Sequence, residues 1–490
     1  MSMGNHQKNI VSDTIKYIPA TLIRAFAGFL IVPLLTRFFD AELYGKYVFA
    51  MSVLTFLQTF VGSWINVTVI RFYAQAEIKQ ETHVLTDSML AVTLLSSITM
   101  SLIVWLFITL TKAYIDDTLL YLLILVPFVL ITSSIVDLPL QTLRAQRKIG
   151  QYSVFTTIST ISVPIIGIMI SYILNGAIIG LIIGSIVAQG VIIFFAYKTC
   201  YRTIPRLNHF RREYARDLIS FGLPIMPTMI FYTILDISDR FILNAFQGSK
   251  ELGIYAVNYT ISWTIISLIG TLVSQSSAPL IVSVWEKEGK TSTERIINAL
   301  LRTYLIIGIP SVIGLVIISS QLSTLLLAPE YVEGAIIYPF IASSALFMGI
   351  QWIAQRGIIL NNRTDLLLKI FFVGSICNIL LNIALIPSLG YFGSAIATLI
   401  AVIIITGFIS YYSTKYITVS IPWISIGRIF AACSMMMIVS GNIPDFGNNI
   451  INITIQCVIS AAVYSIMLII LKEWHISDVV RSLRSYRIIK

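Results

Sequence analysis

Long apolar runs alternate with short polar connections over the whole chain. Fourteen runs are about 20 residues or longer and mostly apolar, which is the length at which an α-helix crosses the hydrocarbon core of a bilayer. They lie near residues 14–36, 46–70, 86–111, 119–140, 152–173, 176–197, 218–243, 253–283, 298–326, 335–359, 366–387, 391–414, 423–441 and 449–471. The pattern therefore predicts an all-α polytopic membrane protein with 14 transmembrane helices.

The polar connections alternate in charge from one to the next. When the runs are threaded through a bilayer in order, about 27 of the 33 basic residues fall on one side. The connections on the other side hold few bases and more acids, among them Asp40, Glu42, Asp116, Asp117, Glu251, Glu330, Glu333 and Asp445. Because Lys and Arg are retained on the cytoplasmic side, we expect a multi-pass protein of the bacterial cytoplasmic (inner) membrane with both termini in the cytoplasm.

The composition agrees with a membrane protein and argues against a soluble, nucleic-acid-binding or metal-binding protein. Hydrophobic residues make up 57% of the 490-residue chain and charged residues only 11%, against about a quarter in soluble domains. The cytoplasmic Lys/Arg excess accounts for the net charge of +10, so we expect no nucleic-acid partner. The four cysteines are scattered singly and the four histidines lie in loops or tails, so we expect no metal site and no cofactor.

The longest polar connection is basic and lies between the sixth and seventh runs. Such a connection midway through twelve runs is typical of a joint between two bundles. We therefore divide the chain into an N-terminal six-helix lobe (1–198), a basic linker (199–216), a C-terminal six-helix lobe (217–416), and an appended segment with helices 13 and 14 and a basic tail (417–490).

The two lobes carry a weak internal repeat. The first run ends in Arg37-Phe38-Phe39 and leads into Glu42-Leu43-Tyr44-Gly45-Lys46-Tyr47, and the seventh ends in Arg240-Phe241-Ile242 and leads into Glu251-Leu252-Gly253-Ile254-Tyr255. Both members start on the cytoplasmic side, so the repeat is parallel, with its axis along the membrane normal. Pro19 and Pro224 also occupy matching positions in the two copies of the repeat. Prolines bend helices, so these two indicate either helices that flex during alternating access or simple packing kinks.

A few ionised side chains lie inside apolar runs, where each is costly and needs a reason. Arg24, near the middle of the first run, either faces a water-filled cavity and binds an anion or pairs with an acid of another helix. In the seventh run Asp236 and Arg240 are four apart and can pair on one helical face, with Asp239 beside them. Arg240 can equally be an interfacial anchor, and we expect Asp137 of the fourth run near the interface.

Several segments together resemble one family. They are Leu143-Arg144-Ala145-Gln146-Arg147-Lys148-Ile149-Gly150, Ser220-Phe221-Gly222-Leu223-Pro224, Asp239-Arg240-Phe241, Glu251-Leu252-Gly253-Ile254-Tyr255, Asn378-Ile379-Leu380-Leu381-Asn382-Ile383-Ala384-Leu385-Ile386-Pro387 and Gly390-Tyr391-Phe392-Gly393-Ser394-Ala395. In this order, and over essentially the whole chain, the sequence resembles the Wzx-type flippases of polysaccharide export. These belong to the MOP superfamily, together with the MATE exporters and the lipid II flippase MurJ.

The resemblance implies a fold and a function. The fold is two six-helix lobes in a V around a central cavity, plus two further helices. The function is that of a transporter and not of an enzyme: it moves undecaprenyl-diphosphate-linked oligosaccharide repeat units, such as those of O-antigen, across the cytoplasmic membrane. The glycosyltransferases and the polymerase of the same pathway are the expected partners, besides the lipid-linked glycan and the bilayer.

The resemblance also implies cationic residues in the cavity and an ion that drives transport. Arg24 and Arg240 match the cavity residues, and Arg71 and Arg302, near the inner ends of their runs, are expected at the cytoplasmic mouth. A coupling ion, H⁺ or Na⁺, would involve the acids of the apolar runs. These candidates for coupling or for ion pairing are Asp236, Asp239 and Asp137.

Two other functions remain open. A MATE-type multidrug exporter shares the fold, but such exporters commonly have twelve spans and bind cations, for which a central arginine is ill suited. A membrane glycan polymerase or ligase would be an enzyme with a large outer loop, whereas no outer connection here exceeds about a dozen residues. The sequence does not specify the sugar or the final polymer.

Overall fold

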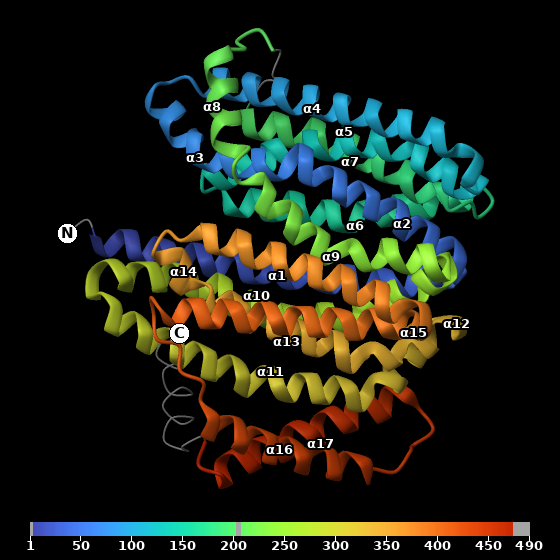
Figure 1. Ribbon diagram of the computed structural model, residues 1–490, viewed down its shortest axis with the longest axis vertical. Coiled ribbons are helices and arrows are strands. Elements are labelled where there is room, and N and C mark those ends of the chain that lie inside the picture. Colours follow the sequence, from blue (N-terminus) through green and yellow to red (C-terminus); the bar gives the residue numbers. More distant parts are fainter. Residues whose placement is uncertain (1–2, 202–206, 474–490) are drawn as a thin grey trace. The chain divides into compact units, whose positions relative to one another are not determined.

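The computed structural model describes residues 3–201 and 207–473 (Figure 1). These residues form helices and no strand, which confirms the predicted all-α fold. The helices are α1 (Met3–Phe38), α2 (Ala41–Gln58), α3 (Trp64–Ile78), α4 (Thr82–Thr111), α5 (Asp117–Ala145), α6 (Ile149–Ile173), α7 (Ile179–Tyr201), α8 (Arg212–Gly222), α9 (Met226–Gln247), α10 (Ser249–Glu288), α11 (Lys290–Leu326), α12 (Pro329–Val332), α13 (Tyr338–Ala354), α14 (Arg356–Leu360), α15 (Thr364–Thr414), α16 (Trp423–Gly441) and α17 (Asn449–Ile470). Short helical turns join some of them: the π-helix η1 (Thr59–Ser63) and the 3₁₀ turns η2 (Lys112–Tyr114) and η3 (Glu333–Ile337).

Of the described helices, 12 are long and apolar enough to cross a membrane, or up to 13 if the bent pair α8 and α9 forms one span. The predicted number of 14 is therefore not confirmed. The runs predicted at 366–387 and 391–414 both lie in α15, whose 51 residues would extend about 77 Å if straight, more than twice the hydrocarbon thickness. Gly390 interrupts α15 with φ 55° and ψ −140°, a conformation that glycine tolerates because it has no Cβ.

Contacts divide the chain into two compact units. Unit 1 comprises Met1–Val257 and Asp365–Ala397, and unit 2 comprises Asn258–Thr364 and Thr398–Lys490. The boundaries fall inside α10 and α15, so each of these helices contributes to both units. The candidate site described below lies within unit 1.

Helix α5 lies in the core of unit 1. It packs against α2, α3, α4 and α7, and Figure 1 shows α4, α5 and α7 running side by side. Leu122, Leu130 and Leu143 on α5 are fully buried. In a membrane such burial stabilises the fold through van der Waals packing, because lipid is as apolar as leucine. Helix α5 is therefore a well-supported element on which to position polar side chains.

The described end of the basic linker is fixed to the start of α4. The backbone N–H of His209 donates to Asp87 Oδ2 over 3.1 Å, and the imidazole Nδ1 lies at the same distance from that oxygen. Tyr214 donates to Glu81 Oε2 over 2.7 Å, and Arg211 forms an ion pair with Glu81. These hydrogen bonds, that of Tyr214 foremost, lower the pKa of Glu81. Helix α8 is thereby anchored to unit 1, and the chain bends by 54° between α8 and α9.

Helices α2 and α10 cross at their first turns with almost no space between their backbones. A Cβ added to Gly45 would lie 2.6 Å from the carbonyl carbon of Ser249, and one added to Gly253 would lie 2.9 Å from that of Ala41, where 3.4 Å is an ordinary contact. The contact is reciprocal, because each glycine meets the residue four positions before the other. Both glycines belong to a Gly-x-Tyr sequence at matching places of the predicted repeat. This is the geometry expected of a parallel two-fold repeat.

Candidate functional site

A stripe of polar side chains runs along the last turns of the otherwise apolar α5. Asp137, Gln141 and Arg144 are spaced i, i+4 and i+7, so they share one face of the helix. Asp137 is half-buried and Arg144 is exposed. Arg144 lies in the last turn, where its charge complements the helix macrodipole. The Nη1 of Arg144 donates to Gln141 Oε1 over 2.9 Å.

The π-helix η1 sets the register of α3 opposite this stripe. A π-turn inserts one residue into the α-helical repeat and is frequent at functional sites. After it, Asn66 on α3 faces α5, and its Nδ2 donates to Asp137 Oδ2 over 3.4 Å. The same turn contacts α9, through a 2.9 Å hydrogen bond between Thr59 Oγ1 and Thr233 Oγ1. The polar face of α5 therefore meets a polar position on α3.

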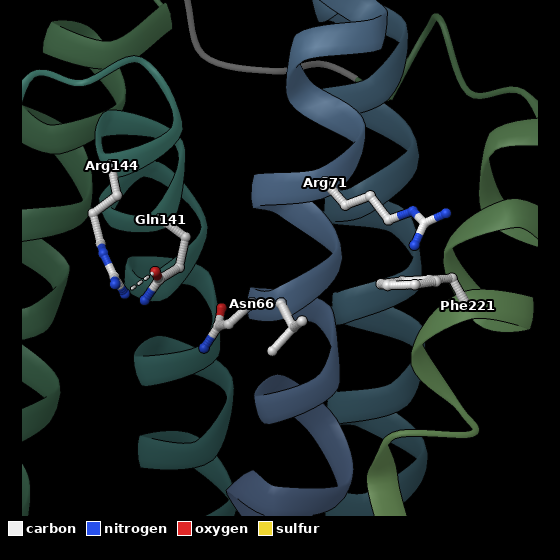
Figure 2. A pocket seen from close by; sticks show the side chains of 6 residues that line it. Asn66, Arg71, Gln141, Arg144 and Phe221 are labelled. Atoms are coloured by element: carbon white, nitrogen blue, oxygen red, sulfur yellow. Dashed lines mark hydrogen bonds between the residues drawn. The ribbon is translucent and has the colours of Figure 1, made fainter. Parts of the chain in front are cut away.

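A cavity of about 380 Å³ lies between α3, the end of α5 and α8. It is lined by Asn66, Val67, Arg71, Gln141, Arg144 and Phe221. Figure 2 shows Gln141 and Arg144 on one side of Asn66, and Arg71 lying over the ring of Phe221 on the other side. The Arg71 Cζ is 4.1 Å from the centre of that ring, a cation–π contact. The cavity thus presents two guanidinium groups and two carboxamides, a donor set that suits an anion with several oxygens.

Arg24 of α1 lies next to this group of residues. It is half-buried, and its Nη1 and Nη2 each donate over 3.3 Å, to Thr156 Oγ1 and Thr21 Oγ1 respectively. The ring of Tyr152 on α6 is 6.0 Å from the Arg24 Cζ and 5.5 Å from the Arg144 Cζ. Tyr152 therefore connects the arginine predicted at mid-depth of the first run with an arginine of the cavity.

Arg240 belongs to a second polar cluster, formed by α9 and α10. Asp239 is only 2% exposed; its Oδ2 accepts from Tyr255 Oη over 2.6 Å and its Oδ1 from the backbone N–H of Arg240 over 2.8 Å. Asp236, by contrast, is exposed. The Arg240 guanidinium interacts electrostatically with both carboxylates. The three charged residues of the seventh run therefore lie near one another, and their role stays a prediction.

Two asparagines of α15 extend this cluster. Ser238 Oγ donates to Asn378 Oδ1 over 2.9 Å, and Asn382 Nδ2 donates to the same oxygen over 3.0 Å. Both asparagines are fully buried. In the described part of the chain, Asn378 Nδ2 and Asn382 Oδ1 find no hydrogen-bond partner. Buried polar atoms of this kind are costly unless a ligand or water satisfies them.

Arg302 lies in unit 2, in an ion triad near the end of α17. The carboxylate of Glu473 is completely buried. It forms ion pairs with Arg302 Nη2 at 2.8 Å and with Arg428 Nη1 at 3.1 Å. Burial of this carboxyl raises its pKa, but hydrogen bonds from Ser425, Arg302 and Arg428 outweigh that effect and hold the pKa of Glu473 below its usual value. Arg302 therefore forms an ion pair with a carboxylate within unit 2. The sequence analysis, in contrast, expects Arg302 at the cytoplasmic mouth of the cavity.

Unit 2 contains a cavity of a different character, about 440 Å³ in volume, between α10, α11, α16 and α17. Its lining has no charged residue. It is lined by Ile265, Ile306, Ile307, Pro310, Ser311, Gly314, Leu315, Ile318, Met436, Gln456, Cys457, Ser460, Ala461, Tyr464 and Ser465. A charged group would lose its hydration there without compensation, so the cavity of unit 1 is the candidate anion site. The described residues contain no group of three or more His, Cys, Asp or Glu that could hold a metal ion.

Five lining residues are not among the sequence candidates: Asn66, Val67, Gln141, Arg144 and Phe221. The i, i+4, i+7 spacing of Asp137, Gln141 and Arg144 is a signal that could have identified the stripe on α5. The sequence carries no comparable signal for Asn66, because the π-turn before it alters the helical register. Of the predicted arginines, Arg71 lines the cavity and Arg24 adjoins it.

Solved structures of two groups of transporters share this fold. A lipid II flippase MurJ in an inward closed conformation matches with a TM-score of 0.74 at 17% identity, over 94% of this chain and 99% of that chain. An inward-facing multidrug MATE transporter of the MOP superfamily matches with a TM-score of 0.63 at 11% identity, over 81% of this chain and 94% of that chain. These similarities confirm the predicted MATE-like fold.

A curated relative carries a function in its name. A probable low-salt glycan biosynthesis flippase of Haloferax volcanii, Agl15, is 22% identical over 201 residues, which is 40% of this chain and 41% of that protein. The chain spans less than half the length of each of the first three curated relatives that it matches.

One family matches a larger part of the chain. Its sequence model, described as polysaccharide biosynthesis protein, covers residues 10–285, more than half of the 490 residues. The matched region includes every residue that lines the cavity of unit 1. The protein therefore belongs to the family of polysaccharide biosynthesis proteins, and its fold is that of the MOP superfamily.

Proposed function

We propose that this protein is a flippase that moves a polyprenyl-diphosphate-linked oligosaccharide across the cytoplasmic membrane by alternating access. In a bacterium the carrier is undecaprenyl diphosphate. The observation that carries the proposal is the cavity of unit 1, in which Arg71 and Arg144 line one space of about 380 Å³. Charged residues make up only 11% of this chain. Two exposed guanidinium groups beside a transmembrane core therefore require either a ligand or contact with water.

The chemistry of the substrate fits this donor set. A diphosphate and a glycan that entered hydrocarbon would lose their hydration without replacement, at a prohibitive cost. Guanidinium groups replace that hydration with paired, charge-assisted hydrogen bonds to phosphate oxygens, each contributing about 1.5–3 kcal/mol. Asn66 and Gln141 supply neutral donors and acceptors for the sugar hydroxyls. The polyprenyl tail has no polar group and can remain in lipid during transport.

The charge distribution supports loading from the cytoplasm. The cavity lies at the end of α5, next to Arg147 and Lys148 in the connection to α6. The positive-inside rule places such basic connections in the cytoplasm, where the lipid-linked sugar is assembled. In this orientation both termini are cytoplasmic, and the crossing of α2 and α10 is at the outer face.

The polar cluster around Asp239 supports a coupling cation, H⁺ or Na⁺. A buried carboxylate can take up a proton, and carboxylate and amide oxygens are also the ligands that hard cations prefer. Asp239 would hold the cation, and Tyr255 fixes its carboxylate by a hydrogen bond. The unpartnered Asn382 Oδ1 is a further available acceptor, connected through Asn378 to Ser238, the residue before Asp239. Asp236 and Asp137 are more accessible acids that can pair with Arg240 and Asn66 respectively.

A complementation experiment tests the function. In a strain that lacks the protein, lipid-linked oligosaccharide should accumulate on the cytoplasmic leaflet, and the wild-type gene should restore export. Arg24→Ala and Arg144→Ala should each lower export about tenfold or more, since each removes charge-assisted hydrogen bonds. Arg24→Lys should retain part of the activity because the charge remains.

Arg212→Ala is the matched control, since Arg212 is exposed on α8 and does not line the cavity. It should export normally at equal expression. Accumulation on the outer leaflet instead would indicate a polymerase or a ligase. Normal distribution of the lipid-linked sugar with altered drug resistance would indicate an exporter of the MATE type.

A further inference from the structure

Phe221 lies at the end of the short helix α8 and lines the cavity of unit 1. Its ring lies beneath the guanidinium of Arg71 in the cavity of unit 1, with the Arg71 Cζ 4.1 Å from the ring centre (Figure 2). The ring of Phe72 meets it edge-on, at 5.8 Å and 87°. Phe221 is therefore held between a cation on one α3 residue and an aromatic ring on the next.

The neighbouring residues fix this ring in place. Gly222 packs so closely on α3 that a Cβ there would lie 3.0 Å from Thr68 Cγ2 and 3.1 Å from Trp64 Cζ3. At its other end α8 is anchored to Glu81 through Arg211 and Tyr214. The backbone that carries the ring is thus held in place at both ends of α8.

The contact leaves hydrogen-bond donors of Arg71 available. Figure 2 shows guanidinium nitrogens of Arg71 that point away from the ring of Phe221, and each of them carries N–H donors. An exposed arginine otherwise loses side-chain conformational entropy when it is held in one geometry. A ring that holds the guanidinium in place beforehand removes part of that cost.

We propose that Phe221 is a positioning residue, which orients the guanidinium of Arg71 so that its donors meet the phosphate oxygens of the lipid-linked substrate. The proposal rests on the proposed flippase function and deepens it. It also accounts for the sequence Ser220-Phe221-Gly222-Leu223-Pro224. Phenylalanine supplies the ring, glycine permits the close approach to α3, and the Leu-Pro step ends the helix before the 54° bend.

The test measures binding of undecaprenyl diphosphate to the full-length protein in detergent, with undecaprenol as the ligand that lacks phosphate. Phe221→Leu should weaken binding of the diphosphate about two- to fivefold, the amount expected of one cation–π contact near the surface. Phe221→Trp should retain or tighten it. Arg71→Ala should weaken binding further, and in that background Phe221→Leu should add nothing, because the contact that it removes is already gone.

Phe231→Leu is the matched control. It alters a phenylalanine of α9 that packs on the ring of Phe372, and it should leave binding unchanged. Equal weakening by Phe221→Leu with and without Arg71 would overturn the positioning role and assign Phe221 to packing alone. So would unchanged binding in Phe221→Leu. A wild-type protein that does not distinguish the diphosphate from undecaprenol would overturn the flippase function itself, and this proposal with it.

If Phe221→Leu fails to fold, as judged by thermal unfolding in detergent, Phe221→Trp and Phe221→Tyr decide between the roles. Both keep an aromatic face of similar or greater size. Binding within twofold of wild type in both variants, together with weak binding in Phe221→Met, would support the positioning role. Weak binding in all three would contradict it, since the aromatic face would then not matter.

Discussion

Substitution of Gly253 by alanine probes the crossing of α2 and α10. The new Cβ would lie 2.9 Å from the Ala41 carbonyl carbon and 3.1 Å from the Gly45 nitrogen, against 3.4 Å for an ordinary contact. Both neighbours are backbone atoms, so no side chain can rotate out of the way. The two helices must separate by at least about 0.5 Å at this point, and more to clear the carbonyl oxygen.

The free-energy cost of this steric overlap can be estimated. Overpacking a tightly fitted contact typically costs about 1–3 kcal/mol. That cost arises only while the two helix starts are in contact and vanishes in a conformation in which they have parted. Alanine favours the helix by about 1 kcal/mol over glycine in either conformation, so the fold is retained. Gly253→Ala should therefore shift the population about 5- to 150-fold toward a conformation in which the two helix starts have parted.

Distance measurements between spin labels test this shift. Labels at position 42 on α2 and position 250 on α10, which are both exposed, are introduced in a variant whose four native cysteines are replaced by serine. Gly253→Ala should lengthen and broaden the distance, and Gly45→Ala should do the same because the contact is reciprocal. Gly190→Ala is the control, since its Cβ would meet nothing within 4 Å.

An unchanged distance in both glycine variants would refute the reasoning, because the crossing would then absorb a methyl group without parting. Loss of helical content or of the thermal transition would also count against it. The crossing would in that case be a requirement of the fold and not a contact that opens during transport.

Three further predictions follow from the charged clusters. Glu473→Gln should lower the free energy of unfolding of unit 2 by about 1.5–3 kcal/mol, measured by chemical denaturation in detergent. Because the pKa of Glu473 is lowered in the folded state, its contribution is present above the ordinary pKa of a glutamate and is lost as the pH falls through the lowered pKa, so the wild type and this variant should converge in acid. Asp239→Asn should abolish stimulation of transport by a Na⁺ or pH gradient in proteoliposomes, yet leave binding of undecaprenyl diphosphate unchanged.

Much of the fold follows from the sequence because lipid imposes a simple rule. A backbone in hydrocarbon must satisfy its own hydrogen bonds, so long apolar runs become helices. The number of spans is less certain for a physical reason. Only Ser388, Leu389 and Gly390 separate the last two runs of the predicted C-terminal lobe, and the helix continues through them except at the glycine.

The site is less predictable, and particular residues explain why. Arg24 is evident because a lone charge in an apolar run has no other simple explanation. Arg144 is hidden among basic residues that the positive-inside rule already explains. The partner of Arg302 is Glu473, 171 positions away, and no spacing rule connects them. Phe221 resembles any apolar helix residue until Arg71 is seen above its ring.

The π-turn at 59–63 makes the cavity sensitive to a single residue of chain length. Deleting one residue there would restore a regular α-helix and rotate α3 by about 100° relative to α2. Asn66 and Arg71 would then leave the wall of the cavity, although the hydropathy of the segment would hardly change. A relative that lacked the extra residue would therefore have to place its cations elsewhere.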